Sequence, residues 1–130
     1  MVKRLIASLG VGAVLAMAVP AIANAQMPMM EKPEGKEMTI SGTVIDLSCK
    51  FAFNLTGDQH RMCAQVCADK GVPLAILGDD GTLYLPVSDV MPGGDQNEQL
   101  KPHAEHKVTV TGMVYDAGGA KAIQITSVSM

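Results

Sequence analysis

The sequence predicts a mainly β domain of the α+β class, with five short strands and one helix that follows the first strand. Three observations support this prediction. Several segments alternate apolar and polar residues, as half-buried strands do. Two of these segments carry a glycine at their centre, and one stretch between the first and second strands has the start and stop signals of a helix.

The first strand is predicted over residues 38–46, because its apolar residues alternate. Four residues share one face: Met38, Ile40, Gly42 and Val44. A glycine inside a strand is typical of a sharp bend or a bulge. The other strands are predicted over 74–78, 82–86, 106–116 and 120–129, and the segment 87–102 is predicted to be an irregular connection. Two glycine turns, at 79–81 and 117–119, join these four strands into two hairpins.

The helix is predicted over residues 59–70. Asp58 stands where an N-cap residue is wanted, and Gly71 stands where a left-handed residue ends a helix. Pro73 then prevents the helix from continuing. A loop over 51–57 is expected to link this helix to the first strand.

Segments 40–46 and 110–116 have similar patterns, with Gly42 and Gly112 at equivalent positions. Two such strands suit a highly curved sheet. Five short strands with one helix therefore predict a small five-stranded OB-like barrel or roll over residues 38–130. The usual OB arrangement inserts its helix between the third and fourth strands, whereas here the helix follows the first strand.

Residues 1–25 are predicted to be a signal peptide. Lys3 and Arg4 precede an apolar stretch over 5–19, and Ala23-Asn24-Ala25 gives the small residues after which signal peptidase cuts. The apolar stretch has about 15 residues, fewer than the roughly 20 that a retained membrane anchor needs. We therefore expect cleavage after Ala25, a periplasmic or secreted protein, and no stable membrane span after cleavage. Residues 26–37 are predicted to be a flexible leader that contains methionine and proline.

The charge balance excludes some classes of partner. Cleavage after Ala25 leaves eight of the ten basic residues against 13 acidic residues, a net charge of about −5. Nucleic acids and anionic membrane surfaces require concentrated positive charge, so neither is an expected partner. The chain also lacks tryptophan, a recognisable nucleophile motif and a phosphate-binding glycine loop followed by a helix. A non-enzymatic role is therefore favoured.

The chemistry of the sequence is concentrated in three cysteines and one histidine. On a helix, His60, Cys63 and Cys67 fall within an arc of about 60°. Cys49 lies near the end of the first strand, and a folded-back loop would bring it to the same face. Three thiolates and one imidazole match a tetrahedral zinc site or a cuprous site.

Two other interpretations of the cysteines remain open. In an exported protein, Cys49 could form a disulfide with a helix cysteine and fasten the helix to the first strand. The three cysteines could also be buried and inert on the inner face of the helix. The presence of His60 favours a metal site or thiol redox chemistry over a structural disulfide, because a disulfide needs no histidine.

Copper is favoured over zinc for two reasons: the protein is expected to be exported, and its methionines supply many thioether groups. Eight of the ten methionines remain after cleavage, and Met27, Met29 and Met30 lie together in the leader. These three could shield a soft ion, or could simply be flexible residues near the cleavage junction. His103 and His106 have a spacing that could bind a metal weakly, but loop histidines in contact with water are the simpler interpretation.

Two resemblances support a shared site. The sequence resembles small exported bacterial proteins that have no assigned activity. The resemblance lies in the pattern Gly42-x-Val44-x-Asp46-x-x-Cys49, then His60-x-x-Cys63-Ala64-x-x-Cys67 and Gly71-x-Pro73. The Cys63-x3-Cys67 pair with a histidine also resembles the copper motif of cytochrome-oxidase assembly proteins. That resemblance implies only the ligand chemistry, since this chain is too short and too rich in strands for their thioredoxin-like fold.

Together these patterns predict a metal-binding protein for copper or zinc, with Cys49, His60, Cys63 and Cys67 as ligands. It would deliver, buffer or sense the ion, and its partner would be a periplasmic metalloprotein or redox protein. The alternatives are a structural or interaction module fastened by a disulfide, and a thiol-redox partner that uses Cys63 and Cys67.

Overall fold

A computed structural model describes residues 32–130, so the predicted signal peptide and the first half of the predicted leader, residues 26–31, lie outside the described residues. The five strands are β1 (Lys36–Asp46), β2 (Leu74–Gly78), β3 (Leu83–Pro86), β4 (Lys107–Ala117) and β5 (Ala120–Ser129). The helical elements are α1 (Leu47–Phe53), the 3-10 turn η1 (Asp58–His60), α2 (Arg61–Asp69), α3 (Asn97–Leu100) and the 3-10 turn η2 (Lys101–His103).

The strands form a closed mixed barrel in the order β1-β2-β3-β5-β4, and β4 pairs with β1 to close it. All neighbours are antiparallel except β3 and β5, which run parallel. Helix α1 follows β1 directly. The predicted fold class, a small five-stranded barrel with a helix after the first strand, is therefore confirmed.

The two central glycines allow neighbouring strands to come close. A Cβ atom at Gly42 would lie 2.5 Å from the carbonyl oxygen of Leu77 in β2. A Cβ atom at Gly112 would lie 2.3 Å from the carbonyl oxygen of Gln124 in β5, beside a register shift between Thr111 and Gly112. The prediction that a mid-strand glycine marks a bend or a bulge is confirmed at Gly112 by this register shift, whereas β1 pairs through Gly42 without one.

The barrel interior is filled by the predicted alternating faces. Val44, Val108, Val110 and Ile123 are almost completely buried, while their neighbours Thr43, Lys107 and Thr109 are not. The core also includes Leu74 and Ile76 of β2, Tyr84 of β3, and Leu100 of α3. Burial of these mostly aliphatic side chains is the main source of stability in a domain of this size.

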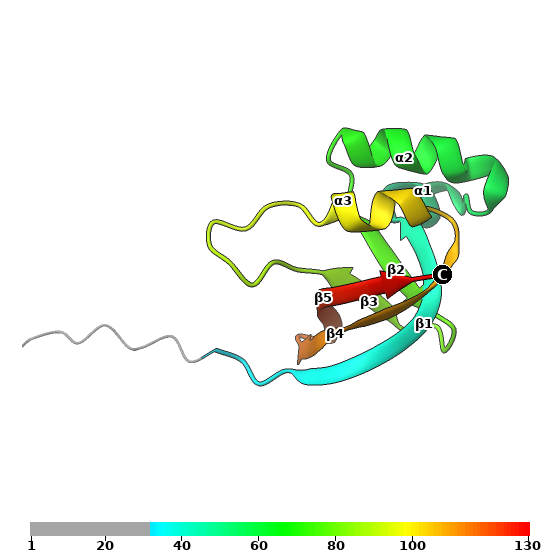
Figure 1. Cartoon of the computed structure of the whole chain (residues 1–130). Coiled ribbons are helices and arrows are strands. Elements are labelled where there is room, and N and C mark those ends of the chain that lie inside the picture. The colour runs from blue at the N-terminus through cyan, green and yellow to red at the C-terminus, as the bar shows by residue number, and fades with distance from the viewer. Residues whose placement is uncertain (1–31) are drawn as a thin grey trace, which may run out of the picture. The chain divides into compact units, whose positions relative to one another are not determined.

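The helices α1, α2 and α3 gather at one end of the barrel, while the segment between β3 and α3 extends away from it (Figure 1). Three details differ from the sequence prediction. Residues 47–53 form a helix where a loop was expected over 51–57. The predicted irregular connection over 87–102 contains α3 and the start of η2, in the place where an OB fold usually carries its helix.

The third difference concerns the predicted N-cap of the helix over 59–70. Asp58 is the first residue of η1, and its side chain makes no capping hydrogen bond. His60 takes the N-cap position of α2, so a tighter turn precedes the regular helix. The predicted left-handed residue at the other end is confirmed, since Gly71 has φ 86° and Val72 N–H donates to the Cys67 carbonyl at 3.0 Å.

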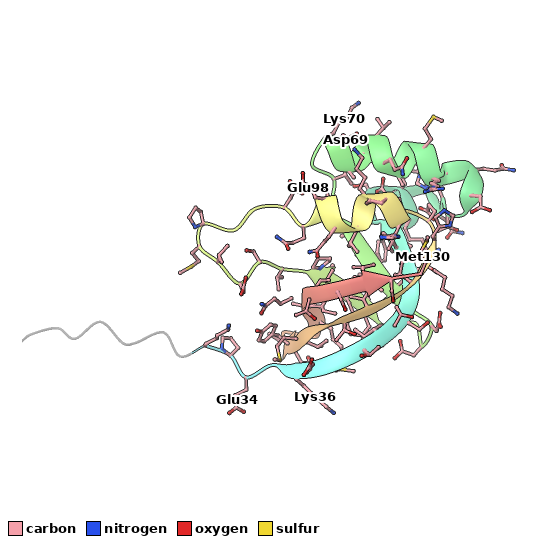
Figure 2. All side chains as sticks on the ribbon, viewed as in Figure 1. Glu34, Lys36, Asp69, Lys70, Glu98 and Met130 are labelled. Atoms are coloured by element: carbon pink, nitrogen blue, oxygen red, sulfur yellow. The ribbon has the colours of Figure 1, made fainter. Side chains whose placement is uncertain are left out.

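One buried amide fixes the C-terminal end of α2 to the barrel. Asn97 Nδ2 donates to the carbonyl oxygens of Ala68 and Val72 at 3.1 and 2.9 Å, and its Oδ1 accepts from Leu74 N–H at 2.9 Å. Asp69, the last residue of the helix, and Lys70, which follows it, are exposed at this end (Figure 2). The helix that carries two of the cysteines is therefore held at a defined position.

Over residues 32–130, no helix combines the length and the apolar character that crossing a membrane requires.

Candidate metal centre

Cys49 is positioned by the start of α1. Asp46, the last residue of β1, is the N-cap of this helix, and its Oδ1 accepts from the Cys49 backbone N–H at 2.9 Å. Asn54 ends the helix in the left-handed conformation, with φ 53°. This short capped helix, rather than a loop, brings the Cys49 side chain back over the barrel end, where it is buried.

The three cysteines come together between α1 and α2. Cys63 and Cys67 are one turn apart on α2, and their Sγ atoms and that of Cys49 all lie within 4.8 Å of one another. Their burial differs: Cys49 is buried, Cys67 is half-buried and Cys63 is exposed. The exposure of Cys63 contradicts the interpretation that all three cysteines are buried and inert. The cluster reaches the surface through Cys63.

His60 is held in a fixed orientation by Glu105, which precedes β4. Nδ1 of His60 lies 2.9 Å from Oε1 of Glu105, and both side chains are buried. An ionised carboxylate can only accept, so Nδ1 carries the hydrogen, and in the neutral imidazole Nε2 then has the free electron pair. Histidines that bind metals typically donate their second N–H to a carboxylate in this way.

Glu105 is itself strongly constrained. Its backbone has φ 62°, an uncommon value for a residue with a side chain, and its N–H donates to the Val44 carbonyl at 2.8 Å. Its second carboxylate oxygen accepts from Gly57 N–H at 2.8 Å. The carboxylate therefore connects the start of η1 to His60. Glu105 was not among the predicted site residues, and no spacing in the sequence points to it.

A second group of potential ligands also contains Cys49. A carboxylate oxygen of Asp46, Sγ of Cys49 and a ring nitrogen of His60 all lie within 4.8 Å of one another, and all three residues are buried. Asp46 was not among the ligands predicted from the sequence. The sequence does contain a signal that places Asp46 beside Cys49. Asp46 stands three residues before Cys49, which is the spacing between an N-cap residue and the backbone N–H that it accepts from.

The Asp46 carboxylate holds protons on the thiols nearby. Oδ2 of Asp46 has no hydrogen-bond partner with ordinary geometry. The carboxylate is nevertheless close enough to Cys67 to act on its thiol proton as an acceptor. This attraction, with burial and the negative charge of Asp46, raises the pKa of Cys67 to about 12. Burial, followed by the same carboxylate, raises the pKa of Cys49. In the metal-free protein the thiols of Cys49 and Cys67 are therefore protonated at neutral pH.

These pKa shifts predict unequal alkylation of the metal-free protein. At pH 8 iodoacetamide should modify the exposed Cys63 first and Cys67 at least tenfold more slowly, because the thiolate is the reactive form. The Asp46→Asn variant should accelerate the modification of Cys67, since it removes the charge that raises its pKa while asparagine still caps α1. Peptide mass spectrometry over time measures both rates. Equal rates at Cys63 and Cys67 in the wild type would contradict this prediction.

Five further candidate ligands were predicted from the sequence. His103 and His106 belong to neither ligand group found in residues 32–130. Met27, Met29 and Met30 lie outside the described residues.

Large apolar side chains are exposed on the same elements as the cysteines: Phe51 and Phe53 on α1, and Met62 and Val66 on α2.

No protein-family model, curated protein or solved structure matches this chain.

Proposed function

We propose that this protein is an exported metal-binding protein, with copper as the favoured ion and zinc second, that delivers, buffers or senses the ion. The observation that carries the proposal is the convergence of three thiols, one of which, Cys49, also lies within reach of the buried His60. Thiolates and imidazole are the ligands that copper and zinc prefer. Export follows from the predicted cleavage after Ala25.

Delivery to a partner is supported by the surface around the cluster. The exposed Cys63 gives an incoming ligand direct access to the ion. The neighbouring Phe51, Phe53 and Met62 are about three-quarters exposed, at 70, 71 and 77%. Exposed apolar groups of this size are typical of protein contacts. A periplasmic metalloprotein or redox protein that presents its own soft ligands would fit this surface.

Metal analysis of the purified full-length gene product tests the proposal. After loading with Cu(I) or Zn²⁺ and removal of loosely bound ions, the wild type should retain at least one equivalent. The Cys63→Ser/Cys67→Ser double variant should retain less than a tenth of the Cu(I) that the wild type retains. His106→Ala is a matched control, because His106 follows Glu105 in the chain but belongs to neither ligand group. Metal-free wild type after both loadings would contradict the proposal.

A disulfide is the second candidate state, because Cys49 and Cys67 lie close enough for their thiols to interact. A protein fastened in this way would be a structural or interaction module, or a partner in thiol redox reactions. Intact mass under native, non-reducing conditions distinguishes these states. Bound metal adds the mass of the ion, whereas a disulfide lowers the mass by two hydrogens. The same mass reports whether the chain begins after Ala25.

A further inference from the structure

The two ligand groups that meet at Cys49 occupy different environments. The outer group, Cys49, Cys63 and Cys67, extends from a buried thiol to an exposed one. The inner group, Asp46, Cys49 and His60, is buried throughout, with Asp46 at 0% and His60 at 7% exposure. One group therefore opens to solvent, and the other lies beneath it at the barrel end.

The inner group contains two buried polar atoms without a partner. Oδ2 of Asp46 and Nε2 of His60 find no hydrogen-bond partner among the described residues. Buried polar atoms are nearly always paired, so each such atom requires an explanation. The other atom of each side chain is already engaged, Oδ1 with Cys49 N–H and Nδ1 with Glu105, so the orientation of both groups is fixed. Both are acceptors, which a cation would satisfy.

The donor chemistry of the two groups also differs. Three thiolates form a soft ligand set that selects Cu(I), which accepts three ligands. A carboxylate, a thiolate and an imidazole form a harder, mixed set that suits Zn²⁺. The carboxylate of Glu105 behind His60 fixes the orientation of the ring, as in the carboxylate–histidine–zinc arrangement.

We propose that the cluster contains two metal positions that share Sγ of Cys49: an outer three-thiolate position for Cu(I), and an inner position for Zn²⁺ formed by Asp46, Cys49 and His60. This proposal rests on the proposed metal-binding function and specifies its ions. Cu(I) is bound where a partner's ligands can reach it, and Zn²⁺ is bound where they cannot. Since one thiolate serves both positions, each ion changes the affinity for the other.

Single variants separate the two positions. Competition titrations against a chromophoric chelator give the affinity for Cu(I), and a fluorescent zinc chelator gives that for Zn²⁺. Cys63→Ser should lower the Cu(I) affinity more than 100-fold and the Zn²⁺ affinity less than tenfold. His60→Ala should do the reverse. These limits follow because even residues behind the ligands contribute about 10–100-fold to metal affinity.

Two further variants protect the test against loss of folding. Asp46→Asn retains an N-cap side chain for α1 but replaces a carboxylate oxygen by an amide, and Glu105→Gln leaves every direct ligand in place. Both should lower the Zn²⁺ affinity at least tenfold. Glu105→Gln should leave the Cu(I) affinity within threefold, and Asp46→Asn should not lower it, because loss of the carboxylate also lowers the pKa of Cys67. Thermal unfolding of each metal-free variant verifies that it is folded.

The outcomes distinguish the two levels of the proposal. If Cys63→Ser and His60→Ala lower both affinities equally, the cluster is a single four-ligand site and the two-position proposal is wrong. If Asp46→Asn and Glu105→Gln leave the Zn²⁺ affinity unchanged, the inner position is also wrong. If the wild type binds neither ion, the proposed function itself fails.

Discussion

Replacing Cys49 with serine should lower the affinity for both Cu(I) and Zn²⁺ by more than 100-fold. Cys49 belongs to both groups of potential ligands, so its loss removes a thiolate from each. A serine hydroxyl stays protonated at neutral pH and is a poor ligand for soft ions. Chelator competition with each ion measures the two affinities.

The fold of the Cys49→Ser variant should change little. Serine is nearly as small as cysteine, and the capping bond of Asp46 is made to the backbone of residue 49, not to its side chain. Far-UV circular dichroism and thermal unfolding of the metal-free protein provide this control. A folded variant that still binds both ions as tightly as the wild type would show that the metal lies elsewhere.

The largest loss of stability should come from Gly112→Ala. The added Cβ atom would lie 2.3 Å from the Gln124 carbonyl oxygen and 3.0 Å from its carbon, both in the backbone of the neighbouring strand. Backbone atoms in a paired strand cannot move aside as a flexible side chain can. The free energy of unfolding should therefore fall by about 3 kcal/mol or more, the upper part of the range for overpacked sites.

Gly94→Ala is the matched control for this variant. A Cβ atom at Gly94 meets nothing within 4 Å, so the same chemical change should leave the free energy of unfolding within about 0.5 kcal/mol of the wild type. Urea titrations followed by circular dichroism compare the two. Equal midpoints for Gly112→Ala and Gly94→Ala would show that β4 and β5 can separate at this point without cost.

The strands were predictable because their signal is local. Alternation and turn glycines predict β2 and β5 with the bounds that the structure has, and the two mid-strand glycines indicate the curvature that a closed barrel needs. The helices α1 and α3 were missed for a physical reason. Seven and four residues are too few to form a stable helix alone, so these helices depend on caps and on contacts with the barrel.

The candidate site was predictable only where its residues share one helix. The spacing of Cys63 and Cys67 is local, whereas the approach of Cys49 depends on α1, which no periodicity indicated. Glu105 reaches His60 from 45 positions further along the chain. A contact of this kind exists only after β4 has paired with β1, so no pattern within a short window of sequence contains it.

The position of Glu105 determines what would be needed to transplant this centre into another scaffold. The candidate ligands all come from one continuous segment, residues 46–67, but the histidine is oriented by a residue outside it. The backbone of that residue is fixed by the Val44 carbonyl, two positions before Asp46. A graft of the continuous segment alone would supply every donor atom and still leave the imidazole free to rotate. A working copy therefore requires a second insert, residues 104–106, placed alongside the strand that leads into the segment.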